Sequence, residues 1–546
     1  MKKLAICLLV ILSFQINAQT AIFDKQESYT RQDSLRGSIT PERAWWNLKH
    51  YHLSVKVDPE NKFISGTNII TYEVLDENNV LQIDLQEPMK ITQATQENQE
   101  LKINREGNAY FIELPKQKAG EEASVTVAFE GKPREAIRAP WDGGYSWKKD
   151  ENGNHFVATS NQGIGASLWW PCKDHMYDEP ENGITLNITA PENLTAVGNG
   201  RLIKSKKNKD GTKTFSWNVV NPINNYGVNV NIGDYVNISS KYKGEKGELD
   251  VDFWVLKYNE DKAKEHFKDA YRTLEAFEHW FGPYPFYEDS YKLVEVPYLG
   301  MEHQSSVTYG NQYQKGYLGS DLSGTGWGLK WDYIIIHETG HEWFANNITY
   351  KDAADMWVHE GFTQYSECLF IEYFYGKEAG AEYNQGLRFG ISNNEPLIGD
   401  YYVNQEGSGD MYAKGSNLLH TIRQVVNDDG KWRAILRGLN KDFYHQTVTT
   451  QEIETYISEK SGKDLSKVFD QYLRDIRIPV LEYVVKDNQM IYRWANCIEG
   501  FDMPLRIKVG EEELWISPKT RHQVMELPKG EVSFDDDFYV YTHKVM

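Results

Sequence analysis

Residues 337–341 bring together side chains that can bind a metal ion. His337, Glu338 and His341 stand in the order H-E-x-x-H, and Glu360 follows after eighteen intervening residues. Histidines four positions apart project from one face of a helix. Two neutral imidazoles and a carboxylate suit a tetrahedral zinc ion whose fourth position stays open for water, as in catalytic sites. We therefore predict one zinc ion per chain on His337, His341 and Glu360, with Glu338 beside it as general base.

The residues around this motif predict a buried helix. Trp331, Tyr333 and residues 334–336 precede it, and Trp343 follows it. A helix with so much apolar surface is buried, and buried histidines need partners. Gly340 lies inside the expected helix, at a cost of about 1 kcal/mol relative to alanine. We expect its missing Cβ to allow another element to approach closely.

The composition describes a large folded protein with an acidic balance. The 546 residues are enough for about three domains, and the 13% aromatic content is typical of a folded core rather than of disorder. Lys and Arg number 59 against 79 Asp and Glu, which gives a formal net charge of −20. This excess of negative charge disfavours nucleic acid and anionic membrane surfaces as partners.

The first eighteen residues have the pattern of a secretory signal peptide. Lys2 and Lys3 form a basic start, residues 4–14 form an apolar run, and Asn17-Ala18 precedes an expected cleavage point. The apolar run is too short for a typical membrane span, and no later segment has eighteen uninterrupted apolar residues. We therefore expect export to a periplasm or to the exterior, and no membrane span in the mature chain.

Hydrophobic periodicity predicts an all-β domain over residues 19–240. Apolar and polar residues alternate in short runs such as 53–57 and 81–85, and Gly- and Asn-rich turns separate these runs. This period of two is typical of half-buried strands.

The period changes to that of helices over residues 241–476. Apolar side chains at 267, 271, 274 and 277 mark one helical face, which ends at the Phe-Gly-Pro stop signal of 281–283. A further helix is expected to begin near Ala413. We predict a mainly helical domain that carries the zinc motif.

Short alternating strands return over residues 477–546. Runs such as 480–485 and 538–541 predict a small β-sandwich. The predicted fold class is therefore multidomain α+β, with a signal peptide over residues 1–18 and three domains after it.

Several segments together resemble the gluzincin aminopeptidases, the family of aminopeptidase N and the leukotriene hydrolases. Glu360 stands in W-V-H-E-G-F, and residues 297–304, P-Y-L-G-M-E-H-Q, are similar to the family's G-x-M-E-N segment. Tyr412 stands in Y-A-K-G, similar to the family's Y-x-K-G. Gln162 lies nine residues before Pro171, a spacing similar to that of the leukotriene-hydrolase branch. The motifs keep the family's order between about residues 45 and 485.

This resemblance implies a fold and an activity. It implies a saddle-like N-terminal β-domain, a thermolysin-like catalytic domain and a β-sandwich. It also implies a zinc metallopeptidase that removes the first residue of peptides with a free N-terminus. Family members often carry a further C-terminal helical domain, for which we expect no room in 546 residues.

The resemblance also implies roles for residues outside the zinc motif. Glu302 matches the amine-binding glutamate, and Gly300 and Met301 stand beside it in the substrate-binding segment. Gln162 matches a second amine anchor, whose amide oxygen can accept a hydrogen bond from an ammonium group. Tyr412 would donate its phenol to the oxyanion that forms during hydrolysis.

Three positions near the motifs need separate interpretations. Glu367 lies seven residues beyond Glu360 on the same helical face, and we predict that it orients a zinc-binding histidine. His303 stands where the family usually has Asn, and we interpret it as a hydrogen-bonding substitute near the subsite for the first residue. His359 points away from its neighbour Glu360 and is not expected to bind the metal.

Two other interpretations share the zinc motif. A thermolysin-like zinc endopeptidase would use the same ligands and Glu338 but needs no amine anchor, so the segment around Glu302 argues against it. A non-catalytic binding protein could retain the zinc fold, but intact Glu338 and Tyr412 argue against that interpretation.

Overall fold

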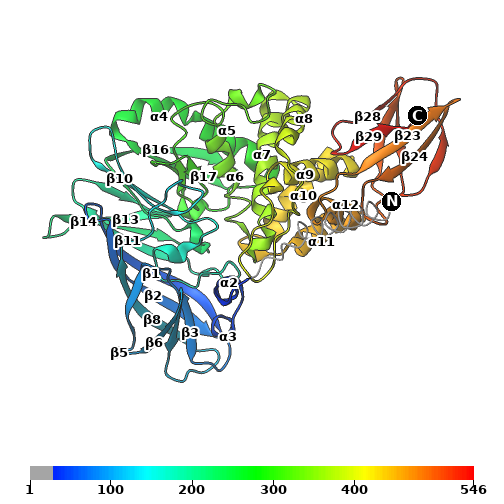
Figure 1. The fold of residues 1–546 in the computed structure, drawn as a ribbon. Helices are drawn as coiled ribbons and strands as arrows, with labels where there is room; N and C mark the ends of the chain where they lie inside the picture. Colours follow the sequence, from blue (N-terminus) through cyan, green and yellow to red (C-terminus); the bar gives the residue numbers. More distant parts are fainter. Residues whose placement is uncertain (1–28, 546) are drawn as a thin grey trace, which may run out of the picture.

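Strands form the first part of the chain, helices the middle and short strands the end, as the colours of Figure 1 show. The structure, a computed structural model, describes residues 29–545. The predicted signal peptide, residues 1–18, lies outside the described residues. The order of the three parts confirms the predicted fold class.

An eight-stranded sheet forms the centre of the N-terminal part, in the order β13-β14-β11-β1-β2-β8-β4-β5. Leu53 and Val55 point into its core, where they pair with Leu186 and Ile188 of a parallel neighbour. The alternation of residues 53–57 therefore reflects one buried and one more exposed sheet face. The strands are β1 Trp46–Asp58, β2 Phe63–Val74, β4 Lys90–Gln96, β5 Gln99–Glu100, β8 Glu122–Gly131, β11 Ile184–Pro191, β13 Arg201–Lys207 and β14 Thr212–Val219.

Two smaller sheets and two short helices complete this domain. Leu81, Ile83 and Leu85 are fully buried, as their alternation predicts. One sheet has the order β3-β7-β6 and the other β12-β15-β10-β9. The elements are α2 Arg31–Gly37, α3 Pro41–Ala44, β3 Val80–Asp84, β6 Lys102–Glu106, β7 Ala109–Glu113, β9 Gly144–Lys149, β10 His155–Ser160, β12 Thr195–Val197 and β15 Asn231–Gly233.

The middle region contains a five-stranded sheet that the sequence pattern did not reveal. Its order is β16-β17-β18-β20-β19. Strands β20 and β19 were missed because they have only three and two residues, too few to show a period of two. All five residues of β18 are buried, so that strand has no exposed face to alternate with a buried one. Strand β16 runs across the predicted boundary after residue 240. The strands are β16 Tyr235–Gly244, β17 Gly247–Leu256, β18 Tyr291–Glu295, β19 Gly300–Met301 and β20 Val307–Tyr309.

Helices pack beside this sheet and build the core of the middle region (Figure 1). Phe267, Leu274 and Phe277 are fully buried, as the helical spacing predicts, and the helix that follows Phe267 ends before Gly282. The helix expected near Ala413 begins at that residue. The elements are α4 Glu260–His266, α5 Lys268–Phe281, α6 Tyr333–Gly340, α7 Trp357–Tyr375, α8 Lys377–Gly386, α9 Ala413–Val426, α10 Asp429–Asp442, α11 Thr450–Ser461 and α12 Ser466–Leu473, with a small sheet of β21 Ile348–Tyr350 and β22 Gln446–Val448.

The C-terminal region is built from a four-stranded and a three-stranded sheet, and it lies on the opposite side of the helical region from the N-terminal sheets (Figure 1). The strand predicted at residues 538–541 begins only at Tyr541. Phe538 and Tyr539 are buried but do not pair as a strand. The apolar residues at these positions therefore indicate burial and not a strand. The strands are β23 Val480–Lys486, β24 Gln489–Ala495, β25 Leu505–Val509, β26 Glu512–Ile516, β27 Gln523–Glu526, β28 Val532–Phe534 and β29 Tyr541–Lys544.

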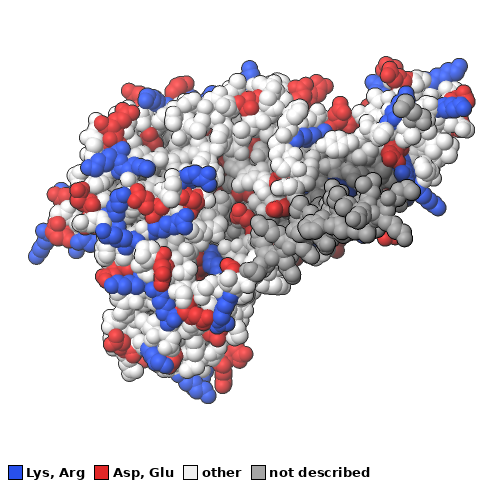
Figure 2. All heavy atoms as spheres, in the orientation of Figure 1, with Lys and Arg blue, Asp and Glu red and all other residues white. Residues whose placement is uncertain are grey.

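Acidic and basic side chains are interspersed over the face seen in Figure 2. Among residues 29–545, no helix combines the length and the apolar composition that crossing a membrane requires.

Candidate active site

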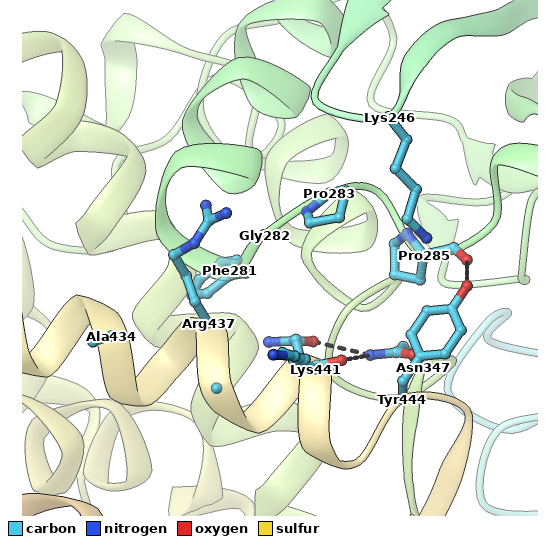
Figure 3. Close-up of a pocket in the computed structure, with 12 residues that line it drawn as sticks. Lys246, Phe281, Gly282, Pro283, Pro285, Asn347, Ala434, Arg437, Lys441 and Tyr444 are labelled. Carbon is cyan, nitrogen blue, oxygen red and sulfur yellow. Dashed lines mark hydrogen bonds between the residues drawn. The ribbon is translucent and has the colours of Figure 1, made fainter.

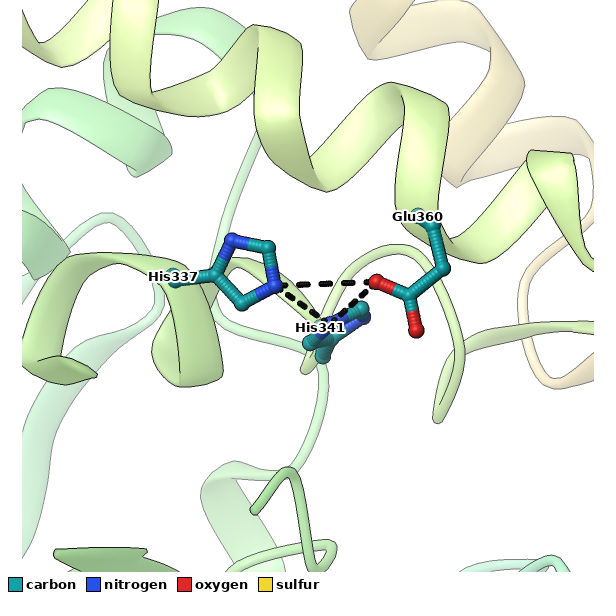
Figure 4. A group of neighbouring side chains, drawn as sticks. All are labelled: His337, His341 and Glu360. Carbon is teal, nitrogen blue, oxygen red and sulfur yellow. Dashed lines mark hydrogen bonds and ion pairs between the residues drawn. The ribbon is translucent and has the colours of Figure 1, made fainter. Parts of the chain in front are cut away.

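Three predicted ligands converge in the middle of the helical region. The Nε2 atoms of His337 and His341 lie 3.3 Å apart, and Glu360 Oε2 lies 3.6 and 3.3 Å from them respectively (Figure 4). Ligand atoms held at about 2.0–2.1 Å by a tetrahedral zinc are separated by about 3.3 Å. The three atoms therefore have the mutual spacing of one face of such a tetrahedron.

Two helices position these ligands. Asp332 caps α6 by accepting a hydrogen bond from Ile335 N, and His341 follows the last residue of this helix. Glu360 lies in the first turn of α7. Gly340 ends α6 where a Cβ would lie 2.6 Å from Ser366 Oγ, so the predicted close approach of another element is confirmed and that element is α7.

The outer nitrogen of each histidine is committed to an acceptor. His337 Nδ1 lies 2.7 Å from Glu367 Oε1, and His341 Nδ1 lies 3.0 Å from the carbonyl oxygen of Phe344. Both acceptors require a proton on Nδ1, which leaves the Nε2 lone pairs free for a metal. Tyr383 holds Glu367 in turn, by donating to its Oε2 at 2.7 Å. Glu367 thus has the contact that its helical position predicts.

The buried polar atoms test whether a zinc ion fits. Glu360 Oε2 is buried and has no hydrogen-bond partner among the described residues, and it faces two nitrogen lone pairs. Three converging acceptors repel one another unless a cation lies between them. Nitrogen and carboxylate donors at this spacing are the ligands that zinc prefers, so the residues present fit that metal.

Glu338 and Glu302 lie against the same centre. Ligand-type atoms of Glu302, Glu338 and His341 all lie within 4.8 Å of one another. Glu338 lines the cleft, and burial raises the pKa of its carboxyl group above its ordinary value. Burial also raises the pKa of Glu302. A carboxylate with a raised pKa beside a metal site is suited to accept and return a proton near neutral pH.

Gln162 reaches the site from the N-terminal domain. Its Nε2 donates hydrogen bonds to Glu302 Oε1 at 2.8 Å and to Glu360 Oε1 at 2.7 Å. The two carboxylates draw the amide nitrogen toward themselves and leave the amide oxygen uncommitted. Gln162 therefore bridges a metal ligand and the candidate amine anchor, a role that sequence reasoning did not foresee.

The segment that contains Gly300 and Met301 forms the short edge strand β19, which pairs with β20. A Cβ on Gly300 would lie 2.4 Å from Ile334 Cγ2, so the strand can approach α6 only because this residue is glycine. The strand lines a cleft of about 150 Å³ that also includes Leu299, Trp141 and the zinc ligands.

Tyr412 lies over the metal site from the N-terminus of α9. Its ring is nearly parallel to that of His337, at 6.0 Å between centroids and 24° between planes. Burial raises the pKa of the phenol, and the hydroxyl interacts with Glu360. A protonated phenol aimed into the cleft is a hydrogen-bond donor for developing negative charge.

The two other histidines of these motifs do not enter the metal site. His303 is fully buried, its Nδ1 lies 3.3 Å from Thr308 Oγ1, and it does not line the cleft. Burial lowers the pKa of His303 to about 3, so its imidazole is neutral. His359 Nε2 accepts a hydrogen bond from Tyr350 N at 2.9 Å and turns away from Glu360. These contacts fit the hydrogen-bonding role expected of His303 and the non-ligand role expected of His359.

Two tyrosines in the site escaped sequence analysis. The ring of Tyr333 stacks on His337, at 5.1 Å between centroids, with its hydroxyl 3.3 Å from His337 Nδ1. Tyr226 interacts with Glu302 through its hydroxyl. Tyr333 could have been found, because it precedes His337 by four residues on the same helical face. Tyr226 has no comparable local signal.

Fold and site together define a zinc metallopeptidase with an N-terminal β-domain. The profile of the Peptidase family M1 domain matches residues 265–472, and that of the Peptidase M1 N-terminal domain matches residues 47–226. Together these matches span more than half of the chain, and the protein belongs to peptidase family M1. Its cofactor is zinc, for which His337, His341 and Glu360 are the fitting donor set.

Curated relatives share this family. The chain is 23% identical over 467 residues to aminopeptidase N of Lactococcus lactis subsp. lactis, which covers 81% of this chain and 52% of the relative. It is 22% identical over 465 residues to puromycin-sensitive aminopeptidase of Caenorhabditis elegans, covering 79% of this chain and 47% of the relative. The chain thus spans about half the length of these relatives.

Solved structures share the fold. The M1 zinc metallopeptidase from Deinococcus radiodurans matches with a TM-score of 0.66 and 19% identity, over 80% of this chain and 95% of that one. A two-domain M1 zinc metallopeptidase variant bound to L-tryptophan matches with a TM-score of 0.67 and 20% identity, over 80% and 95%.

Proposed function

We propose that this protein is a zinc aminopeptidase that removes the first residue of peptides with a free N-terminus. The observation that carries the proposal is the position of Glu302 and Gln162 beside the zinc donors within one buried cleft. An ammonium group only donates hydrogen bonds, so it is bound by carboxylate and carbonyl oxygens. Glu302 Oε and the free amide oxygen of Gln162 supply both kinds of acceptor.

The chemistry follows from the groups that face the cleft. Zinc, when bound, polarises the scissile carbonyl and acidifies water. Glu338 takes the proton of the attacking water and passes it to the leaving amine. Tyr412 donates its phenol proton in a hydrogen bond to the oxyanion, and such preorganised donors are worth about 3–4 kcal/mol.

The position of cleavage follows from the amine anchor. Carboxylate and imidazole atoms of Glu302, Glu338 and His341 lie within 4.8 Å of one another, so an ammonium held at Glu302 leaves little chain between itself and the reacting carbonyl. The cleft of about 150 Å³ is smaller than the roughly 300–1,000 Å³ of sites that enclose drug-sized ligands. Both features favour cleavage after the first residue of the peptide.

A panel of aminoacyl-coumarin substrates tests the proposal. We expect hydrolysis that is lost on chelation and restored by zinc. Glu338→Gln should lower kcat by at least about 10²-fold, since it removes the proton acceptor, while zinc content stays unchanged. A zinc-loaded protein that cleaves none of the panel, and behaves like Glu338→Gln, would instead support a non-catalytic binding protein.

Acetylated substrates distinguish an aminopeptidase from a thermolysin-like endopeptidase. Acetylation removes the ammonium charge that Glu302 and Gln162 are proposed to bind, so hydrolysis should stop. An endopeptidase uses the same zinc ligands without this anchor. Unchanged cleavage of N-acetylated peptides would therefore favour the endopeptidase.

We also propose that the protein is exported, as a periplasmic or extracellular enzyme. The basic, apolar and small-residue order of residues 1–18 supports this proposal. Cell fractionation with N-terminal sequencing of the mature chain tests it. Full-length protein that retains Met1 in the cytoplasmic fraction would contradict export.

A further inference from the structure

A second cavity, of about 620 Å³, lies in the catalytic region and shares no lining residue with the zinc cleft (Figure 3). The segment after α5, the turn between β16 and β17, and helix α10 enclose it. Its size falls within the roughly 300–1,000 Å³ of small-molecule sites. None of the groups assigned to peptide hydrolysis uses it.

The cavity has an apolar body. Phe281, Pro283 and Pro285 line one side of it, and Ala434 and Tyr444 contribute from α10 and the segment after it. Helix α10 turns a small residue toward the cavity at Ala434, so the space is not filled from that side. Binding of an apolar ligand against such a lining is favourable by about 25 cal/mol for each Å² of apolar surface removed from water.

The polar side chains that line the cavity form hydrogen bonds with other groups of the protein. Asn347 donates to Asn440 Oδ1 at 3.1 Å and accepts from His445 N at 3.0 Å. The Tyr444 hydroxyl donates to the carbonyl oxygen of Pro285 at 2.8 Å. These bonds hold the lining side chains in place before any ligand binds. Because the lining polar groups already have partners, they do not require a polar ligand.

Three cationic side chains line the cavity in a chain whose net charge is −20. Arg437 is neutralised by Glu245, at 2.7 Å. Lys246 and Lys441 are exposed and form no ion pair with any residue of the described range 29–545. The ammonium of Lys246 lies 4.9 Å from the ring centroid of Tyr444, at the apolar wall. Neither the Lys246 nor the Lys441 ammonium is therefore committed to an ion pair, and both side chains line the cavity.

We propose that this cavity binds a small organic acid, with its apolar body against Phe281, Pro283 and Tyr444 and its carboxylate at Lys246 and Lys441. Charge complementarity selects the anion, since a cationic head would meet two unpaired lysines and a neutral head would gain no ion pair. Because the polar groups that line the cavity already have hydrogen-bond partners, an apolar ligand body is favoured over a polar one. Binding here is separate from peptide hydrolysis.

Calorimetric titration of decanoate and of 2-naphthoate into the zinc-loaded full chain tests the proposal. We expect saturable binding of one molecule per chain by at least one of the two acids. The double variant Lys246→Gln, Lys441→Gln should weaken it at least tenfold. The matched control Lys204→Gln, Lys206→Gln removes two exposed charges from β13 and should leave it unchanged. Decyl glucoside, with the same apolar chain and no charge, should bind at least tenfold more weakly than decanoate.

Filling the cavity tests the location independently of charge. Ala434→Trp places an indole in the space and should abolish binding while circular dichroism and thermal unfolding stay as in the wild type. Absence of saturable binding by both acids, binding within twofold of wild type in the double lysine variant, or displacement by an amino-acid hydroxamate bound at the zinc cleft would overturn the proposal. Calorimetry does not require turnover, so these outcomes are independent of the aminopeptidase proposal.

Discussion

At the scale of residues, single side chains and one carbonyl group determine where the protons of the metal site lie. Glu367 keeps a proton on His337 Nδ1 and so directs the Nε2 lone pair at the metal position, and the Phe344 carbonyl does the same for His341. Gln162 donates both amide protons, one to Glu302 and one to Glu360, and so holds these two carboxyl groups side by side. Such outer contacts set ligand orientation and basicity.

We expect Glu367→Gln to weaken zinc binding by about 10–100-fold, because the neutral amide supports the His337 Nδ1 proton less strongly. Competition with a fluorescent zinc chelator measures the change. Glu378→Gln, at an exposed position of α8, is the matched control and should bind zinc like the wild type. Equal zinc affinity in the two variants would contradict a positioning role for Glu367.

Glu302→Gln removes the charge that faces the substrate ammonium. Loss of one partner of a buried charge pair costs about 2–5 kcal/mol, so kcat/KM should fall by about 10²-fold or more, mainly through KM. Steady-state kinetics on a free-amine substrate measures this, and zinc content should stay constant. A fall in kcat alone with KM unchanged would assign Glu302 to the chemical step instead of to amine binding.

At the scale of elements, close approach between helices and strands gives the site its shape. Helix α6 meets α7 across Gly340, and α9 meets α7 where Gly415 and Gly361 face each other. A Cβ on Gly415 would lie 2.9 Å from Gly361 Cα, which is too close for an unperturbed backbone. This crossing sets the position of Tyr412, three residues before Gly415, over Glu360.

Gly415→Ala should therefore push α9 from α7 and move Tyr412 from the cleft. We expect kcat to fall at least about tenfold, since small displacements of catalytic groups are costly, and stability to fall by about 1–3 kcal/mol from overpacking. Gly430→Ala is the control, because a Cβ there meets only Asp428 Oδ1, at 3.4 Å. Wild-type kinetics in Gly415→Ala would show that the crossing tolerates the methyl group.

At the scale of the whole molecule, the cleft depends on two domains. A small apolar cluster joins them: Ala158, Tyr226, Val296, Tyr298 and Met301. Asn224 Nδ2 donates to Asn346 Oδ1 at 3.0 Å, and Asn404 Nδ2 donates to the Gly163 carbonyl at 3.2 Å. Gln162 thus reaches Glu302 and Glu360 only while the N-terminal domain is docked.

Zinc removal should lower the thermal stability of the whole assembly. A ligand that binds only the folded state stabilises it by about 4 kcal/mol at 1,000 times its Kd. The loss of stability should be larger here, because zinc removal leaves Glu302, Glu338 and Glu360 close together without a cation. Differential scanning calorimetry with and without chelator measures the shift in Tm. His337→Ala should unfold at the same temperature in both conditions, and an equal chelator shift in that variant would contradict the assignment.

The regular parts of the fold could be predicted, and the short ones could not. Alternation at 53–57 and 81–85 and the helical spacing from 267 to 277 were confirmed because each element is long enough to show its period. Strands β19 and β20 have two and three residues and show none. They form because neighbouring strands supply hydrogen-bond partners, which local sequence does not record.

Local geometry by itself determined the zinc motif, since the 3.6-residue period fixes where His337, Glu338 and His341 point once the helix forms. Tertiary structure decided how the other site residues come together. Gln162 lies 140 residues from Glu302 and 198 from Glu360, yet it hydrogen-bonds both. Contacts over such separations depend on how two domains pack, and no local period encodes that packing.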